Sequence, residues 1–251
     1  MRLPFVRQGP AGAPPVVLVH GFTQTARCWA PVDTDLAADH EVLALDLPGH
    51  GDAPDVRADL WGTADLVAAT VRDAVEGPVT LLGYSLGGRV ALHVALAHPE
   101  VIARLVLVGA TPGLVDGDER AARRASDAAL ADRIEAIGVP AFLDEWLALP
   151  LFAGLSPATA HRAEREANTA SGLASSLRLT GTGTQDPLWD RLAEITVPTL
   201  LVTGGADARF TAIAERMVPR LGGPAHHVVV PGAGHTTHLE APEAVLAALR
   251  G

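Results

Sequence analysis

The sequence of 251 residues contains a single cysteine, Cys28. One thiol excludes an internal disulfide and gives no support to a metal site built from cysteines. Apolar runs are also short, and none approaches the length of about 20 residues that a membrane-spanning helix needs. The first ten residues include prolines where a signal peptide would carry its apolar block. We therefore expect a cytoplasmic protein that does not use a membrane as a partner.

Lysine is absent, so all 19 basic residues are arginines, and they are outnumbered by 29 acidic residues. The net charge of −10 argues against a nucleic-acid partner or an anionic membrane surface. Arginine can bind a carboxylate through two parallel hydrogen bonds, so an acidic chain can still form a local site for an anionic small molecule. We expect no metal and no cofactor, and either a monomer or a homodimer.

Short apolar runs alternate with helical patterns over most of the chain. The apolar runs cover residues 16–20, 41–46, 79–82, 103–109, 198–204 and 226–230. Helical patterns follow near residues 29–39, 63–76, 86–98, 211–221 and 242–249. This alternation predicts an α/β fold with a mostly parallel, doubly wound sheet.

The alternation is interrupted between residues 111 and 190, where no convincing strand is found. Helical patterns occupy residues 120–137, 140–147 and 161–179 instead. A helical block between two core strands is typical of a lid inserted at the carboxyl edge of a sheet. We therefore predict a core of residues 1–110 and 191–251 and a helical lid, hereafter the lid segment, of residues 111–190.

The stretch Gly83-Tyr84-Ser85-Leu86-Gly87 lies between an apolar run and a helical pattern. G-x-S-x-G in this context is the signature of a nucleophile elbow, in which a sharp turn lifts the serine hydroxyl above the sheet. The glycines on both sides are needed because the turn brings the backbone into crowded contact. We predict that Ser85 is a catalytic residue rather than an incidental serine in a glycine-rich turn.

A serine hydroxyl becomes reactive when an imidazole accepts its proton, and that imidazole needs an acid behind it. His235 follows the last apolar run in a glycine-rich loop and is the best placed of the ten histidines. Asp207 follows the run 198–204, at the end of the sheet that faces the site. Asp186 and Asp190 are alternative candidates for the acid, and Asp207 could instead form an Asx turn.

An oxyanion hole requires two N–H groups that point at one oxygen atom. The N–H of Leu86 is one candidate because it lies at the start of a helix. The N–H of Phe22 is the other, because the His20-Gly21-Phe22 turn directly follows a strand. We expect His20 to anchor that turn, and His238 to be structural or to line the pocket.

Several stretches together resemble the α/β-hydrolase superfamily over the whole chain. Within it the chain is similar to one family, the SHCHC (2-succinyl-6-hydroxy-2,4-cyclohexadiene-1-carboxylate) synthases of menaquinone biosynthesis (MenH). The resemblance rests on HGFTQT, GYSLGGRVAL, GATPGL, FLDEWLALPLFAGL, LRLTGTGTQDPLW and GAGHTTHLEAPE. The matches in the lid segment weigh most, because lids vary more than cores in such superfamilies.

The resemblance implies a lyase that uses a Ser-His-Asp triad to expel pyruvate from an anionic, enolpyruvyl-bearing cyclohexene carboxylate (SEPHCHC), which yields SHCHC. It implies Ser85, Asp207 and His235 as the triad. It also implies a set of substrate-binding residues, namely Tyr84, Arg89, Arg123, Trp146 and Arg165. For the last of these the helix register leaves Arg162 as an alternative.

Residue chemistry alone supports these arginines unequally. Arg89 lies one turn past Ser85 in an otherwise apolar helix, so its buried charge needs a carboxylate from the protein or from a substrate. Arg123 and Arg165 lie on charge-rich helices, where most arginines are solvated. Trp146 could belong to the packing face of the lid segment.

Two other functions remain open at this point. One is a hydrolase of the same fold, a carboxylesterase or a carbon–carbon bond hydrolase, that uses the same triad. The other is a ligand-binding protein that keeps the triad without using it.

Overall fold

The computed structural model describes residues 1–250, and these form a seven-stranded sheet in the order β1-β3-β2-β4-β5-β6-β7. The strands are β1 (Phe5–Gln8), β2 (Pro15–Val19), β3 (Glu41–Leu45), β4 (Val79–Tyr84), β5 (Ile102–Val108), β6 (Thr199–Gly204) and β7 (Ala225–Val230). Only β1 is antiparallel to its neighbour, β3, and all other pairs are parallel. The predicted α/β fold is therefore confirmed, with β1 as an edge strand that the sequence analysis did not include.

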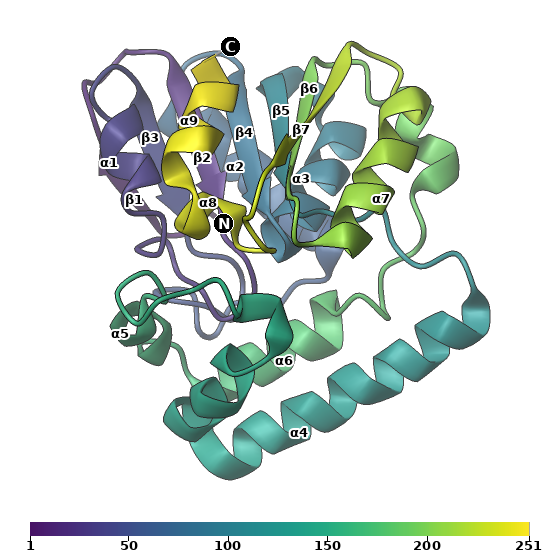
Figure 1. Cartoon of the computed structure of the whole chain (residues 1–251). Coiled ribbons are helices and arrows are strands. Elements are labelled where there is room, and N and C mark those ends of the chain that lie inside the picture. The colour runs from purple at the N-terminus through teal and green to yellow at the C-terminus, as the bar shows by residue number, and fades with distance from the viewer. Residues whose placement is uncertain (251) are drawn as a thin grey trace.

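Helices cover both faces of this sheet (Figure 1). They are α1 (Val32–Leu36), α2 (Leu60–Ala74), α3 (Leu86–Ala97), α7 (Ala208–Met217), α8 (Thr237–Glu240) and α9 (Pro242–Arg250), with short 3-10 turns at Pro99–Val101, Trp189–Glu194 and Val218–Arg220. Alternate residues of a strand point to opposite faces. Val17 and Val19 of β2 pack in one buried cluster with α2 and α3. Val16 and Leu18 pack in the other with α1 and α9.

The lid segment contains helices α4 (Gly117–Leu147), α5 (Arg162–Glu166) and α6 (Ala170–Thr180) and a 3-10 turn at Pro150–Phe152. Figure 1 shows these helices together at one end of the sheet, below the carboxyl ends of its parallel strands. They have a hydrophobic cluster of their own, which includes Ile134, Phe142 and Leu173. That residues 111–190 form a unit separate from the core stays a prediction.

One expected helix is much shorter than predicted. The helix expected at 29–39 is reduced to Val32–Leu36, which Pro31 precedes. The two helices expected at 120–137 and 140–147 are confirmed as the two parts of α4, which are separated by a break at Gly138, whose φ is +77°. Among residues 1–250, none of the helices combines the length and the apolar character that crossing a membrane would require.

Candidate active site

Ser85 occupies the sharp turn between β4 and α3. Its φ is +51°, a value that side chains other than glycine rarely adopt. A Cβ on Gly83 would overlap the backbone of Gly87, and a Cβ on Gly87 would overlap the carbonyl of Val19. Both glycines of the motif are therefore required by close backbone contacts, and the turn has the geometry of a nucleophile elbow.

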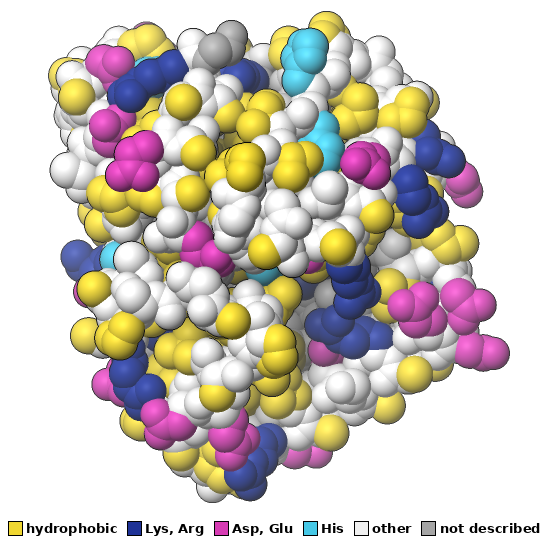
Figure 2. Space-filling view, viewed as in Figure 1, with side chains coloured by type: hydrophobic (Ala, Val, Ile, Leu, Met, Phe, Trp, Pro, Cys, Tyr) yellow, Lys and Arg dark blue, Asp and Glu magenta, His cyan; other side chains and the backbone are white. Residues whose placement is uncertain are grey.

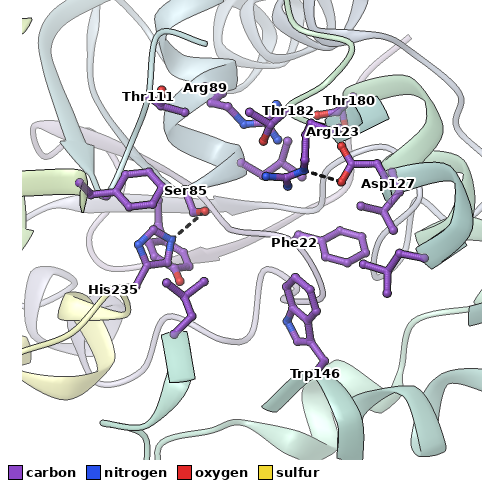
Figure 3. A pocket seen from close by; sticks show the side chains of 18 of the residues that line it. Phe22, Ser85, Arg89, Thr111, Arg123, Asp127, Trp146, Thr180, Thr182 and His235 are labelled. Carbon is purple, nitrogen blue, oxygen red and sulfur yellow. Dashed lines mark hydrogen bonds and ion pairs between the residues drawn. The ribbon is translucent and has the colours of Figure 1, made fainter. Parts of the chain in front are cut away.

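Three side chains from three separate segments meet at this turn. His235 Nε2 lies 3.1 Å from Ser85 Oγ, and His235 Nδ1 lies 2.8 Å from Asp207 Oδ2. The other oxygen of Asp207 accepts a hydrogen bond of 3.2 Å from the N–H of Phe210, at the start of α7. The structure thus brings the three predicted residues into a hydrogen-bonded chain with the order of a serine triad. Figure 3 shows the pair of Ser85 and His235.

The alternative acids do not take part in this chain. Asp186 and Asp190 are both exposed, whereas Asp207 and His235 are buried. The structure therefore places Asp207, and neither Asp186 nor Asp190, in hydrogen-bond contact with the imidazole of His235.

The N–H groups predicted to form the oxyanion hole belong to residues of one cavity wall, Phe22 and Leu86. No backbone acceptor among residues 1–250 takes either N–H. Gln24 fixes the turn that carries Phe22 through two hydrogen bonds. Its side-chain oxygen accepts from the N–H of Gly21 at 3.0 Å, and its backbone N–H donates to the Gly21 carbonyl at 3.1 Å. The sequence analysis did not identify Gln24.

His20 also fixes the turn that carries Phe22. Its Nδ1 lies 2.8 Å from the Gly21 carbonyl, and its Nε2 accepts from the N–H of Leu47 at 3.1 Å. Burial lowers the pKa of His20 to about 4, so the ring is neutral at pH 7. His238 is also buried, its pKa is lowered well below the usual value by burial, and its ring lies 4.2 Å from that of Tyr84. Both histidines are structural, as expected.

A cavity of about 440 Å³ opens beside Ser85, within the range usual for small-molecule sites. Figure 2 shows a hollow between the core and the lid segment, with arginine side chains in and beside it. Every residue that the sequence analysis assigned to the site lines this cavity: Phe22, Tyr84, Ser85, Leu86, Arg89, Arg123, Trp146, Arg165, Asp207 and His235. Arg162 is absent from its lining.

Arg89 is buried in α3 and points into the cavity (Figure 3). Its guanidinium donates to the Thr180 carbonyl at 2.7 Å and to the side-chain oxygen of Gln185 at 3.4 Å. No carboxylate of residues 1–250 lies within 4.0 Å of it. Burial, with a smaller contribution from Arg123, lowers its pKa to about 10, so it remains charged at pH 7. The charge therefore lacks a protein counter-ion at contact distance and faces an open cavity.

Arg123 reaches the same cavity from α4. Its Nε donates to Asp127 Oδ1 at 2.8 Å, one helical turn further on (Figure 3). Asp127 is buried and also accepts from the N–H of Gly183 at 3.4 Å. Asp127 therefore pairs with Arg123 and not with Arg89, which leaves unbalanced positive charge at this end of the cavity for an anion.

Arg165 and its neighbour Arg162 point in different directions from α5. Arg165 is 1% exposed; it donates from Nε to the Ala160 carbonyl at 2.7 Å and from Nη1 to the hydroxyl of Thr23. Its Nη2 has no hydrogen-bond partner among residues 1–250, and burial lowers its pKa. Arg162 is bound on the surface by Asp144 and Glu166. Of these two arginines, only Arg165 lines the cavity, and its role in binding substrate stays a prediction.

Aromatic side chains form the remaining wall. Trp146 lies 5.4 Å from the ring of Phe22 and 5.4 Å from that of Phe152. Its indole N–H is buried and has no hydrogen-bond partner among residues 1–250. Tyr84 packs beside His235, and burial raises its pKa. Trp146 is therefore both part of the packing face and part of the cavity wall.

Two further residues at this site were not found from the sequence. Arg209, in the first turn of α7, lies exposed at the rim of the cavity and is in no ion pair within residues 1–250. Asn168 joins the lid segment to the core, because its amide donates to the Thr23 carbonyl at 2.8 Å and its oxygen accepts from the N–H of Gly51 at 2.9 Å. Asn168 has no local sequence signal, since its role depends on contacts distant in the chain.

Comparison with known proteins agrees with the fold. Residues 16–248 match the model of the alpha/beta hydrolase family. The chain therefore belongs to the alpha/beta hydrolase family.

Its relatives within that family include proteins named as SHCHC synthases. The chain is 36% identical to the 2-succinyl-6-hydroxy-2,4-cyclohexadiene-1-carboxylate synthase of Enterobacter sp. (strain 638), over 97% of this chain and 93% of that relative. The structure of MenH from S. aureus superimposes with a TM-score of 0.90 at 30% identity, over 100% of this chain and 98% of that one. A thermophilic esterase from Thermogutta terrifontis superimposes with a TM-score of 0.82 at 26% identity, over 99% and 91% of the two chains.

Proposed function

We propose that this protein is an SHCHC synthase, a carbon–oxygen lyase that eliminates pyruvate from SEPHCHC in menaquinone biosynthesis. The observation that carries the proposal is the set of three arginines, Arg89, Arg123 and Arg165, that line the cavity beside Ser85. Two of them have no protein carboxylate at ion-pair distance among residues 1–250. The relatedness to proteins named as SHCHC synthases supports the same conclusion.

The geometry of Ser85 and His235 supports proton abstraction. His235 Nε2 is positioned to take the hydroxyl proton while Asp207 stabilises the resulting imidazolium. The oxygen of Ser85 then removes a proton from a ring carbon of the substrate. The electron pair of that C–H bond forms a ring double bond, and the C–O bond to the enolpyruvyl group breaks. The leaving group departs as the enolate of pyruvate and takes up a proton at its methylene carbon to give pyruvate.

The remaining residues would stabilise charge during this reaction. The N–H groups of Phe22 and Leu86 would bind the oxygen on which negative charge develops. The arginines would bind the carboxylates of the substrate through charge-assisted hydrogen bonds. A buried cation without a protein partner is unfavourable until an anion arrives, so the cavity is better suited to a multiply anionic substrate than to a neutral one.

One alternative function is favoured by a specific observation. The hydrogen-bonded order of Ser85, His235 and Asp207 is also that of serine hydrolases, and the Thermogutta terrifontis neighbour is named as an esterase. A hydrolase of neutral esters would form an acyl-enzyme at Ser85 and would gain nothing from unpaired arginines in its acyl pocket.

A paired assay separates the two functions. Pyruvate release from SEPHCHC and hydrolysis of p-nitrophenyl acetate are measured in the wild type, in Arg89→Ala and in Arg123→Ala, with Arg162→Ala as the surface control. For the synthase, we expect pyruvate release whose kcat/KM falls by about tenfold to a hundredfold in the two cavity variants, which corresponds to about 1.5–3 kcal/mol for a lost charged hydrogen bond. Rapid ester turnover with an acyl burst, no pyruvate and unaffected arginine variants would establish the esterase instead.

The setting in which the enzyme works is part of the same proposal. Its partner is a small anionic molecule, and we place the reaction in the cytoplasm, with the enzyme as a monomer or a homodimer. Sedimentation of the purified protein at several concentrations tests the oligomeric state.

A further inference from the structure

Glu240, the last residue of α8, binds the backbone on both sides of His235. Its Oε2 accepts from the N–H of Gly234 at 2.6 Å. Its Oε1 accepts from the N–H of Thr236 at 3.1 Å and from the hydroxyl of Thr236 at 2.6 Å. Among residues 1–250, no arginine or histidine forms an ion pair with this carboxylate. Both of its oxygen atoms are therefore engaged with the loop that carries the imidazole.

The lid segment touches the same carboxylate from the opposite side. A Cβ on Gly154 would overlap Glu240 Oε2, so the backbone of the lid segment lies directly against it. Gly154 follows the turn Pro150–Phe152, in which Leu151 and Phe152 line the cavity. One short stretch of the lid segment thus contacts both the substrate cavity and the residue that holds the His235 loop.

We propose that Glu240 is a positioning residue for His235, and that Gly154 keeps its carboxylate in place, so that the seating of the lid segment determines how well His235 aligns with Ser85. The inference needs the action of His235 on Ser85, which is part of the proposed function, but it does not depend on which substrate the enzyme takes. Proton transfer requires the imidazole within hydrogen-bonding reach of the hydroxyl. A displacement of about 1 Å in such a site can lower the rate about a hundredfold.

Two substitutions disturb this arrangement from its two sides. In Glu240→Gln, the amide nitrogen must face at least one N–H or O–H donor, so hydrogen bonds to the loop are lost. In Gly154→Ala, the new methyl group displaces the carboxylate while the loop itself is unchanged. The matched controls are Glu243→Gln, an exposed carboxylate at the start of α9, and Gly117→Ala, where a Cβ meets no atom within 4 Å.

The readouts are kcat and KM for pyruvate release and the rate constant for phosphorylation of Ser85 by diisopropyl fluorophosphate. We expect both variants to lower kcat and the phosphorylation rate constant by about tenfold to a hundredfold, with KM within about twofold of the wild type. The controls should match the wild type. Because the phosphorylation rate constant refers to each folded molecule, partial unfolding that reduces only the amount of active protein leaves it unchanged.

The double variant tests whether Gly154 acts through Glu240. Since both substitutions disturb the same contact, the double variant should be no slower than Glu240→Gln alone. Effects that multiply, or single variants with wild-type rate constants, would overturn the inference. A wild-type enzyme that releases no pyruvate but is phosphorylated would contradict the proposed synthase. The phosphorylation rate constants of the variants would still decide the role of Glu240.

Discussion

The core and the lid segment contribute different kinds of residue to one cavity. Ser85, Asp207 and His235 come from loops that follow strands of the core, whereas Arg123, Trp146 and Arg165 come from the lid segment. The core residues are hydrogen-bonded to one another. Arg165, by contrast, depends on a distant contact with Thr23 for its orientation. The comparison teaches that the core contributes a hydrogen-bonded chain of three side chains together with Arg89, while the lid segment contributes two further arginines to the same cavity.

The largest effect is expected from removing the reactive group of the core. Ser85→Ala should lower kcat by about 10⁴-fold or more, because neither His235 nor Asp207 can act on substrate without the hydroxyl. The fold should be unaffected, since Ser85 is at a turn that opens into the cavity. Single-turnover measurements of pyruvate release check this, with Ser171→Ala on the surface of α6 as control. Retention of a tenth of the wild-type rate would contradict the assignment.

The acid of the core should have the next largest effect. Asp207→Asn should lower kcat by about 10³- to 10⁴-fold with little change in KM, because an amide favours the wrong tautomer of His235. Asp186→Asn, at an exposed position, serves as the matched control. A loss of activity in Asp186→Asn and a normal rate in Asp207→Asn would reverse the assignment of the acid.

Substitution in the lid segment should affect recognition more than chemistry. Arg165→Met should lower kcat/KM for pyruvate release by about tenfold to a hundredfold, mainly through KM, because a charged contact with substrate is lost. Arg162→Ala should be close to the wild type, since its ion pairs with Asp144 and Glu166 lie on the surface. If Arg165→Met fails to fold, Arg165→Lys keeps the charge but loses the planar fork, and it should give a smaller loss in the same direction. Equal effects at both positions would remove the distinction between them.

Stability in acid should depend on buried histidines of the core, without a direct effect on catalysis. His20, His50 and His93 are core residues whose pKa values burial lowers to about 4, 3 and 4. Below pH 6.5 the unfolded chain binds protons at these residues and the folded protein does not, so the free energy of unfolding falls with pH until the folded values are reached. At pH 5 this corresponds to about 2 kcal/mol for each histidine.

Urea denaturation at pH 7.5 and pH 5 measures this loss. In His93→Gln the decrease between the two pH values should be smaller by about 2 kcal/mol, since one titrating group is removed. His226→Gln, at an exposed position of β7, is the control and should show the wild-type decrease. An unchanged decrease in His93→Gln would show that the buried ring does not resist protonation.

Features of the site that depend on local backbone geometry could be predicted from the sequence. The elbow at Ser85 needs glycines at fixed positions, and the order of strand, turn and helix is visible in the hydrophobic pattern. His235 and Asp207 could be found because each follows an apolar run that ends at the same edge of the sheet. The strand β1 was not found, because four partly polar residues at an edge give little pattern.

Features that depend on packing between distant segments could not be predicted in the same way. The register of α5, which turns Arg165 inward and Arg162 outward, is set by its contact with Thr23, a residue 142 positions away. The sequence pattern around Glu240 indicates only an acidic residue before a helix. Its role is visible only from the three hydrogen bonds around His235.

Two hydrogen bonds of Asn168 tie the lid segment to the core. They connect it to Thr23 beside the turn that carries Phe22 and to Gly51 of the loop after β3. Movement of the lid segment away from the core at this place would break both bonds and disturb that turn. Arg209 of α7, by contrast, lines the same cavity and faces solvent. An anion that approaches this acidic protein near Arg209 would therefore meet a local positive charge.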